Sequence, residues 1–157
     1  MKHPKAKRDG EIRQLLRATL GSQLKDTSGG LGIGRPDVNP RSRQLRVTTT
    51  NWKMVKFGDP PQGVIFRDGS FLTIYEVWSE EGELLYFSYH YQRPDPVRWR
   101  FFRYDRELPD PPPVDKPRHH LHVCSELHFA TGPVKLEDVL NVIAELFKRQ
   151  AGGQEVL

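Results

Sequence analysis

Imidazole groups are concentrated in one short segment of this chain. Three of its six histidines lie within four residues, as His119, His120 and His122, and the only cysteine, Cys124, follows two positions later. Because side chains alternate between the two faces of a β-strand, a strand here would place His120, His122 and Cys124 on one face. The other face would carry His119, Leu121 and Val123, of which the last two are suited to a core. We therefore predict that the face with the paired imidazoles is open to solvent and forms the floor of a functional site.

The elements that would position this segment are strands of alternating polarity. Three segments alternate apolar and polar side chains, with short turns between them: residues 71–78, 84–92 and 97–105. This spacing predicts an antiparallel meander. His90 belongs to the second of these strands, and Arg103 and Asp105 share a face of the third. An Asp-Gly pair at residues 68–69 predicts a hairpin turn before the first.

Helices are predicted near both ends of the chain. Apolar residues at helical spacing predict a helix over residues 11–20, with Asp9 as its N-cap, and another over residues 135–149. The predicted fold is α+β: an antiparallel β-sheet of about five to seven strands, with an N-terminal and a C-terminal helix packed on one face.

We predict a single domain over residues 44–150. Residues 1–43 would form a basic arm, the short helix and a Gly/Pro-rich connector, and residues 151–157 a frayed tail. The five prolines within residues 106–117 predict an extended crossing loop before the histidine strand.

Composition fits a globular protein and limits the partners only weakly. The 24 Lys and Arg residues exceed the 20 Asp and Glu residues by four, which permits a nucleic-acid partner without requiring one. No apolar run approaches the ~18 residues of a membrane-spanning helix, so no membrane partner is expected. A single cysteine cannot form an internal disulfide and no signal peptide is evident, so we expect a cytoplasmic protein.

Several motifs resemble the TumE-like toxin family, which comprises small toxins of bacterial type II toxin–antitoxin modules. The resemblance covers about residues 64–147, with the motifs in the family's order. The motifs are Tyr89-His90-Tyr91-Gln92, Arg103-Tyr104-Asp105, His119-His120-Leu121-His122 and Leu136-Glu137-Asp138-Val139-Leu140. The chain departs from the family's pattern at Leu121, where a lysine is familiar, and at residues 106–109, where the family often continues Asn-x-Pro-His.

This resemblance implies a toxin with a cognate antitoxin, usually a DNA-binding protein, and leaves a homodimer open. Toxins of the family are suspected of acting on RNA, so we expect an endoribonuclease that needs no cofactor. His120 and His122, with His90 as a third candidate, would supply the acid and the base, because imidazoles titrate near neutral pH. Arg103 would hold the phosphate in its planar fork, and Asp105 would orient a histidine.

Further residues are candidates for binding the RNA. Aromatic rings could stack on unpaired bases, and arginines could contact phosphates. The candidates are Tyr89, Tyr91, Gln92, Arg98, Arg100 and Tyr104.

Two other interpretations remain open. A divalent metal could bind His120, His122 and Cys124, with His90 or Asp105 from a neighbouring strand completing the site. Alternatively, the sheet could be a non-enzymatic module that binds protein or nucleic acid, with histidines that only hydrogen-bond across strands.

Overall fold

The computed structural model describes residues 4–25, 31–33, 37–39, 41–49, 54–107, 114 and 116–157. Residues 1–3, much of the Gly/Pro-rich connector and most of the predicted Pro-rich loop (108–113 and 115) lie outside the described residues. The helices are α1 (Pro4–Leu20), a short 3₁₀ helix (Gly21–Gln23) and α2 (Leu136–Ala151). The strands are β1 (Asp37–Val38), β2 (Leu45–Thr48), β3 (Val64–Ile65), β4 (Phe71–Trp78), β5 (Leu84–Gln92), β6 (Phe101–Arg106), β7 (His119–Val123) and β8 (Phe129–Ala130).

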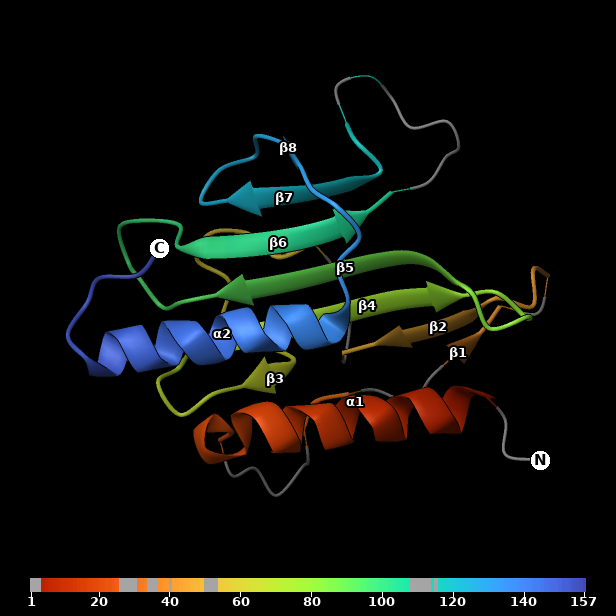
Figure 1. Ribbon diagram of the computed structural model, residues 1–157, viewed down its shortest axis with the longest axis horizontal. Helices are drawn as coiled ribbons and strands as arrows, with labels where there is room; N and C mark the ends of the chain where they lie inside the picture. Colours follow the sequence, from red (N-terminus) through yellow and green to blue (C-terminus); the bar gives the residue numbers. More distant parts are fainter. Residues whose placement is uncertain are drawn as a thin grey trace.

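The strands form one antiparallel sheet. Seven of them follow one another in the order β1-β2-β4-β5-β6-β7-β8, and the two-residue β3 pairs with β4 beside β2 (Figure 1). The long strands β4, β5 and β6 lie at its centre, joined by short connections. The hairpin predicted at residues 68–69 is present: the Gly69 N–H donates to the Phe66 carbonyl, and Gly69 takes the positive φ (+85°) that glycine tolerates. The predicted meander is thus confirmed.

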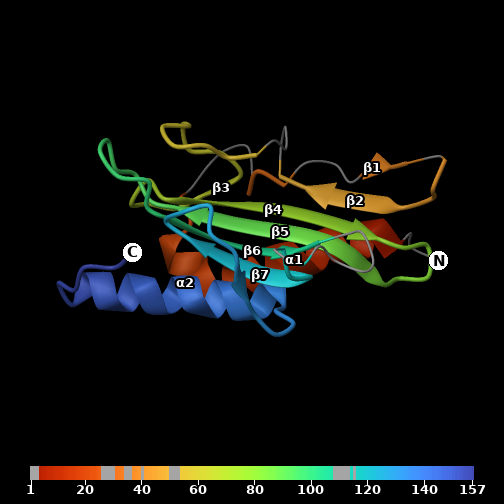
Figure 2. The ribbon, with the colours of Figure 1, turned by 90° about the horizontal axis from the view of Figure 1, so that it is seen from above.

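Both long helices lie on one side of the sheet, and residues 54–63, which precede β3, lie on the other (Figure 2). The α+β prediction, with both helices on one face, is therefore confirmed. The core fills the space between helices and sheet. It contains Ile12, Leu16, Leu20, Val47, Leu72, Ile74, Phe87, Tyr89, Tyr91, Phe102, Leu136, Leu140 and Ile143. No helix within the described ranges is long and apolar enough to cross a membrane.

The N-terminal helix is longer than predicted. α1 begins at Pro4 rather than after Asp9, so most of the expected basic arm is helical and Asp9 pairs with Arg13 inside the helix (3.2 Å). A buried ion pair explains the difference. Arg8 donates from Nη2 and Nε to the Glu76 carboxylate at 2.7 and 2.9 Å, which ties the first turns of α1 to β4. α1 thus contributes Ile12, Leu16 and Leu20 to the same core as the strands.

The start of β6 and the C-terminal tail also differ from what the sequence predicts. The strand predicted from residue 97 begins at Phe101, because the Asp95 carboxylate accepts hydrogen bonds from the backbone of Val97 and Arg98 and holds them in a turn. Within the predicted frayed tail, residues 151–155 are exposed, but Val156 is buried and Glu155 pairs with Arg98 and Arg100.

Arg8→Ala should destabilise the protein by about 3 kcal/mol, because it leaves the fully buried Glu76 carboxylate without its cation. Tyr89 and Trp78 would still donate to that carboxylate, at 2.7 and 2.8 Å. The measurement is the free energy of unfolding in denaturant. Arg17→Ala, an exposed arginine of the same helix, is the control and should change it little. Equal values for the two variants would contradict a stabilising role for the Arg8–Glu76 pair.

Candidate functional site

The predicted site residues occupy neighbouring positions on the face of the sheet opposite the helices. His90 on β5 lies across from Arg103 on β6, and Arg103 lies across from His122 on β7. The next row joins Ser88 and Asp105 on the same two strands to His120. Directly paired side chains of one face stand about 4.5–5.5 Å apart at Cβ, so this register brings the imidazoles, the guanidinium and the carboxylate together.

Asp105 lies at the centre of this group. Its Oδ2 atom accepts a 2.8 Å hydrogen bond from Arg103 Nε and lies 3.4 Å from the Nε2 atoms of both His120 and His122. The two histidine contacts are longer than ordinary hydrogen bonds. Arg103 also contacts Met54 Sδ at 3.3 Å and the exposed Glu126 carboxylate at 3.6 Å. One carboxylate oxygen therefore faces three cationic or protonatable groups.

The structure overturns the prediction that this face is open to solvent. His90, Arg103, His120 and His122 each expose 4% of their surface or less. The contacts of Met54 with Arg103, and of a further histidine with the imidazole pair, show that neighbouring segments fold over the face. The residues converge as predicted, but beneath other side chains.

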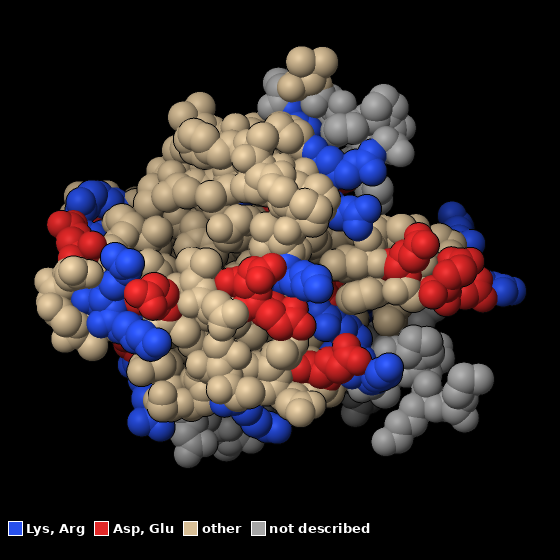
Figure 3. Space-filling view, in the orientation of Figure 1, with Lys and Arg blue, Asp and Glu red and all other residues tan. Residues whose placement is uncertain are grey.

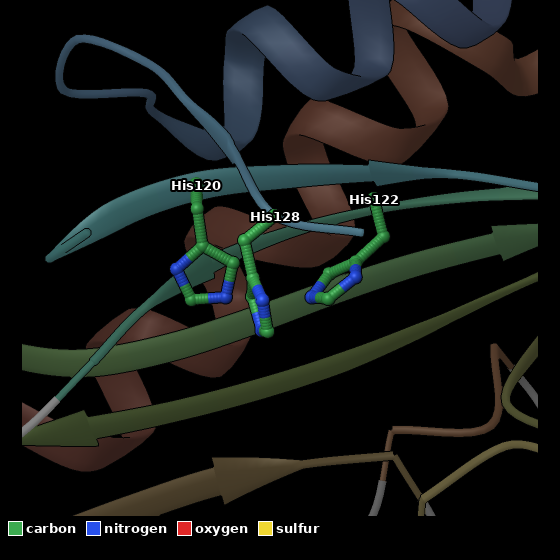
Figure 4. Close-up of side chains that lie close together, drawn as sticks. All are labelled: His120, His122 and His128. Atoms are coloured by element: carbon green, nitrogen blue, oxygen red, sulfur yellow. The ribbon is translucent and has the colours of Figure 1, made fainter. Parts of the chain in front are cut away.

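That further histidine is His128, which sequence analysis did not single out. Its ring lies 4.8 Å from the ring of His120 and 4.7 Å from that of His122, between centroids, and it enters from the loop between β7 and β8 (Figure 4). Unlike the pair beneath it, His128 is exposed. A lone histidine in an irregular loop has no periodicity to place it, so the only available signal was its residue type.

Cys124 does not join the imidazoles, because the strand ends before it. Its φ of +52° lies in the left-handed region, which breaks the alternation that would have placed it beside His122. Its Sγ instead bonds to the Phe101 carbonyl, at 3.4 Å, and the residue is exposed. The predicted metal set of His120, His122 and Cys124 is therefore wrong in its third member.

The protonation of His120 follows from its two neighbours. Its Nδ1 lies 2.7 Å from the Pro117 carbonyl, which can only accept, so Nδ1 carries a proton and donates it. Burial disfavours the imidazolium, but Asp105 and the Pro117 carbonyl outweigh it, and the pKa of His120 is raised above 6.5. Asp105 responds in the opposite direction: burial would raise its pKa, but His120, His122 and Arg103 hold it well below its usual range.

The pKa of His90 is shifted in the opposite direction. Its ring stacks on Phe101, with centroids 5.0 Å apart, and its Nε2 lies 2.9 Å from Gln92 Oε1. Burial lowers the pKa of His90 to about 4, with the Arg103 charge acting in the same direction and Gln92 opposing it only partly. His90 is therefore neutral near pH 7 and cannot act as a general acid there.

The predicted RNA-stacking tyrosines are on the wrong face. Tyr89 and Tyr91 are fully buried in the core beneath the helices, because they alternate with His90 along β5. Tyr104 is half-buried and packs against the same core. These rings cannot stack on a base beside the histidines. Gln92 does lie on the histidine face, where its Oε1 accepts from both His90 and Trp99 at 2.9 Å.

A surface hollow of about 240 Å³ lies next to Gln92. Phe57, Phe71, Trp99, Arg93 and Arg98 also line it, together with Asp59 and Asp95, so it combines aromatic rings with charges of both signs. The predicted Arg98 is thus at its edge with 61% of its side chain exposed. Arg100 is instead mostly buried, and its Nε lies 2.8 Å from the Asp95 carboxylate in an ion pair.

The opposite face of the sheet is covered by the helices (Figure 2). Lysines and arginines are mixed with acidic side chains over α2 and its surroundings (Figure 3). A surface of mixed sign provides little attraction for a polyanion.

Two overlapping groups of side chains could hold a metal ion. Ligand atoms of His120, His122 and His128 lie within 4.8 Å of one another, and so do those of Asp105, Glu107 and His120. Imidazole nitrogens suit zinc and similar ions, whereas carboxylates also suit magnesium.

Comparison with known proteins identifies one family. The family model described as Toxin TumE matches residues 37–150, which is most of the chain. No curated protein and no solved structure matches. The resemblance predicted over residues 64–147 is confirmed and extends towards the N-terminus.

The pKa values of His90 and His120 should be shifted in opposite directions from that of a free imidazole. In NMR titrations of the protein in a metal-chelating buffer, the His90 ring should stay neutral down to about pH 4, while the His120 ring should stay protonated above pH 6.5. Assignments would come from His90→Gln and His120→Gln variants. Identical titration midpoints for the two rings would contradict the assigned environments.

The same difference affects stability. Between pH 6.5 and about 4 the unfolded chain protonates His90 while the folded protein does not. The contribution of His90 to the free energy of unfolding therefore falls as the pH falls, by up to about 3 kcal/mol. His120 has the opposite sign: its contribution is complete below pH 6.5 and is lost as pH rises through its raised pKa. Denaturant unfolding at several pH values should show a smaller acid-side loss in His90→Gln than in the wild type.

Proposed function

Because this chain belongs to the TumE toxin family, we propose that it is the toxin of a bacterial toxin–antitoxin module and acts in the cytoplasm as an endoribonuclease. Its partner in the module would be a cognate antitoxin, expected to be a DNA-binding protein. The reaction would use histidines as acid and base, with RNA as the substrate.

One observation carries the ribonuclease proposal: three imidazoles converge beside a guanidinium and a carboxylate. His120 and His122 flank Asp105 at 3.4 Å, and Arg103 donates to the same oxygen at 2.8 Å. RNA cleavage by attack of the 2′-hydroxyl needs a base for that hydroxyl's proton and an acid for the leaving oxygen. Two of the three clustered imidazoles, those of His120, His122 and His128, would form this pair, and Arg103 would be the phosphate anchor.

Substrate access must involve His128. The five predicted catalytic residues are buried, whereas the ring of His128 contacts both His120 and His122 and is itself exposed. Its imidazole is the part of the cluster that a phosphate meets first. We assign His128 as the group that contacts the substrate, and as acid or base together with one histidine beneath it.

The hollow beside Gln92 would bind the neighbouring nucleotide. Trp99 would offer a ring face for a base, and Arg93 and Arg98 would offer charge for a phosphate, with Arg98 exchanging its 3.3 Å pairing with Glu155 for that contact. Gln92 lies two residues after His90 on β5, and alternate residues share a face. The hollow and the imidazole cluster are therefore on the same face of β5.

Burial of the cluster favours a second candidate function. In that case the charged residues only join β5, β6 and β7, and the protein is a non-enzymatic binding module. Leu127 and Phe129, exposed by 66% and 50% at the β7–β8 edge, would then be contacts for a partner.

His128→Ala should abolish growth arrest on expression and lower RNA cleavage by the purified protein about 10²–10⁴-fold, as expected for loss of an acid–base group. Since His128 is exposed, the fold should survive, as a thermal melt would show. His119→Ala is the control, because His119 lies on β7, the strand of His120 and His122, but on its opposite face. Full cleavage by His128→Ala would contradict the assignment, and absence of cleavage and toxicity in the wild type would favour the binding module.

Arg98→Ala should weaken binding of single-stranded RNA with little dependence on sequence, and should lower the slope of log K against log salt by about 0.7, the value of one phosphate contact. Filter binding or fluorescence anisotropy over a salt series measures both. Arg17→Ala, on the helix side, should leave the slope unchanged, and an unchanged slope in Arg98→Ala would rule out a phosphate at this arginine.

A further inference from the structure

Three imidazoles at this site are arranged as metal ligands usually are. His120 and His122 project from the same face of β7, and His128 reaches the space between them from the β7–β8 loop (Figure 4). One nitrogen from each lies within 4.8 Å of the others. We propose that His120, His122 and His128 bind a divalent transition-metal ion, with Zn²⁺ as the occupant.

The orientation of His120 supports this proposal independently. Its Nδ1–H donates to the Pro117 carbonyl at 2.7 Å, so Nε2 is the nitrogen turned into the cluster. Metal-bound histidines characteristically donate their second ring N–H to a carbonyl or carboxylate in this way, which fixes the ring for the metal. Nδ1 of His122 is buried and has no hydrogen-bond partner among the described residues, and Nε2 of His120 has only its long 3.4 Å contact with Asp105 Oδ2.

The geometry requires only a modest contraction. Nitrogens bound to a tetrahedral zinc at about 2.0–2.1 Å lie about 3.4 Å apart, compared with the present limit of 4.8 Å. Two of the ligands are fixed on one strand, while His128 lies in an exposed loop and can approach. Three protein ligands leave a fourth position for water or substrate, as in catalytic rather than structural zinc sites.

The charge around the cluster can accommodate a dication. Arg103 carries a positive charge close by, but Asp105 pairs with it at 2.8 Å, and Glu126 lies 3.6 Å from its other end. Glu107 adds a further carboxylate in the group that it forms with Asp105 and His120. Lys116 lies 2.8 Å from Glu107, so three carboxylates face two cations, Arg103 and Lys116, which leaves an excess of one negative charge. The three nitrogen ligands select against Mg²⁺ and Ca²⁺, which prefer oxygen.

The proposal also bears on regulation, and this part rests on the ribonuclease proposal. Each lone pair given to the metal is one that can no longer take up or deliver a proton. Zn²⁺ bound across the histidines would therefore inhibit RNA cleavage, and a chelator would restore it. The metal would act as a reversible inhibitor of the toxin.

The test is metal binding by the full chain in the absence of RNA, so its outcome does not depend on ribonuclease activity. Chelator-treated protein would be titrated with Zn²⁺ by calorimetry, and with Co²⁺ by visible absorption, which reports tetrahedral coordination. We expect one ion per chain in the wild type. His128→Ala should weaken binding by more than about tenfold, since even an outer-shell partner is worth about 10–100-fold.

Two control variants make the result specific. His119→Ala removes an adjacent histidine from the opposite face, and Cys124→Ser removes the only thiol; both should bind Zn²⁺ as the wild type does. The proposal is overturned if His128→Ala binds as tightly as His119→Ala, if Cys124→Ser loses the ion, or if the wild type binds none. Cleavage that is insensitive to Zn²⁺ in a protein that binds it would overturn the regulatory part alone.

Discussion

The buried carboxylate of Asp105 holds the polar groups on the histidine side of the sheet together. One of its oxygens, Oδ2, faces a guanidinium and two imidazoles. Arg103 meets it from the same strand, and His120 and His122 meet it from β7. Removing a carboxylate from water without such partners costs several kcal/mol. The register of β6 against β7 is therefore fixed by electrostatics as much as by backbone hydrogen bonds. A slip of one residue would turn both imidazoles into the apolar core.

Glu76 plays the equivalent part on the helix side. It lies on the core face of β4, fully buried, and receives hydrogen bonds from Arg8, Trp78 and Tyr89. The sheet thus carries one buried carboxylate on each face. One ties the N-terminal helix to the sheet, and the other gathers the candidate catalytic groups.

The strand pattern was enough to predict most of the fold, and it assigned His90, Arg103 and Asp105 to their faces correctly. Two-residue alternation fixes faces but not coverage, so it could not show that loops close over the imidazoles. His128 and Cys124 show the limit most clearly. One comes from a loop without periodicity, and the other leaves its expected face through a positive φ of +52°. The early start of α1 could not be predicted from local sequence, because the ion pair that stabilises it joins Arg8 to Glu76, 68 residues away.

The depth of the imidazole cluster has a consequence for genetics. Substitutions at Asp105, His120 or His122 remove buried polar partners, so they would lower the amount of folded protein in a cell as well as any chemistry. Selection for survivors would then recover escape alleles across the whole cluster, many acting through degradation. Changes at the exposed His128 should instead leave a folded, inactive protein at normal abundance. Immunoblotting of the survivors would distinguish degraded variants from folded but inactive ones.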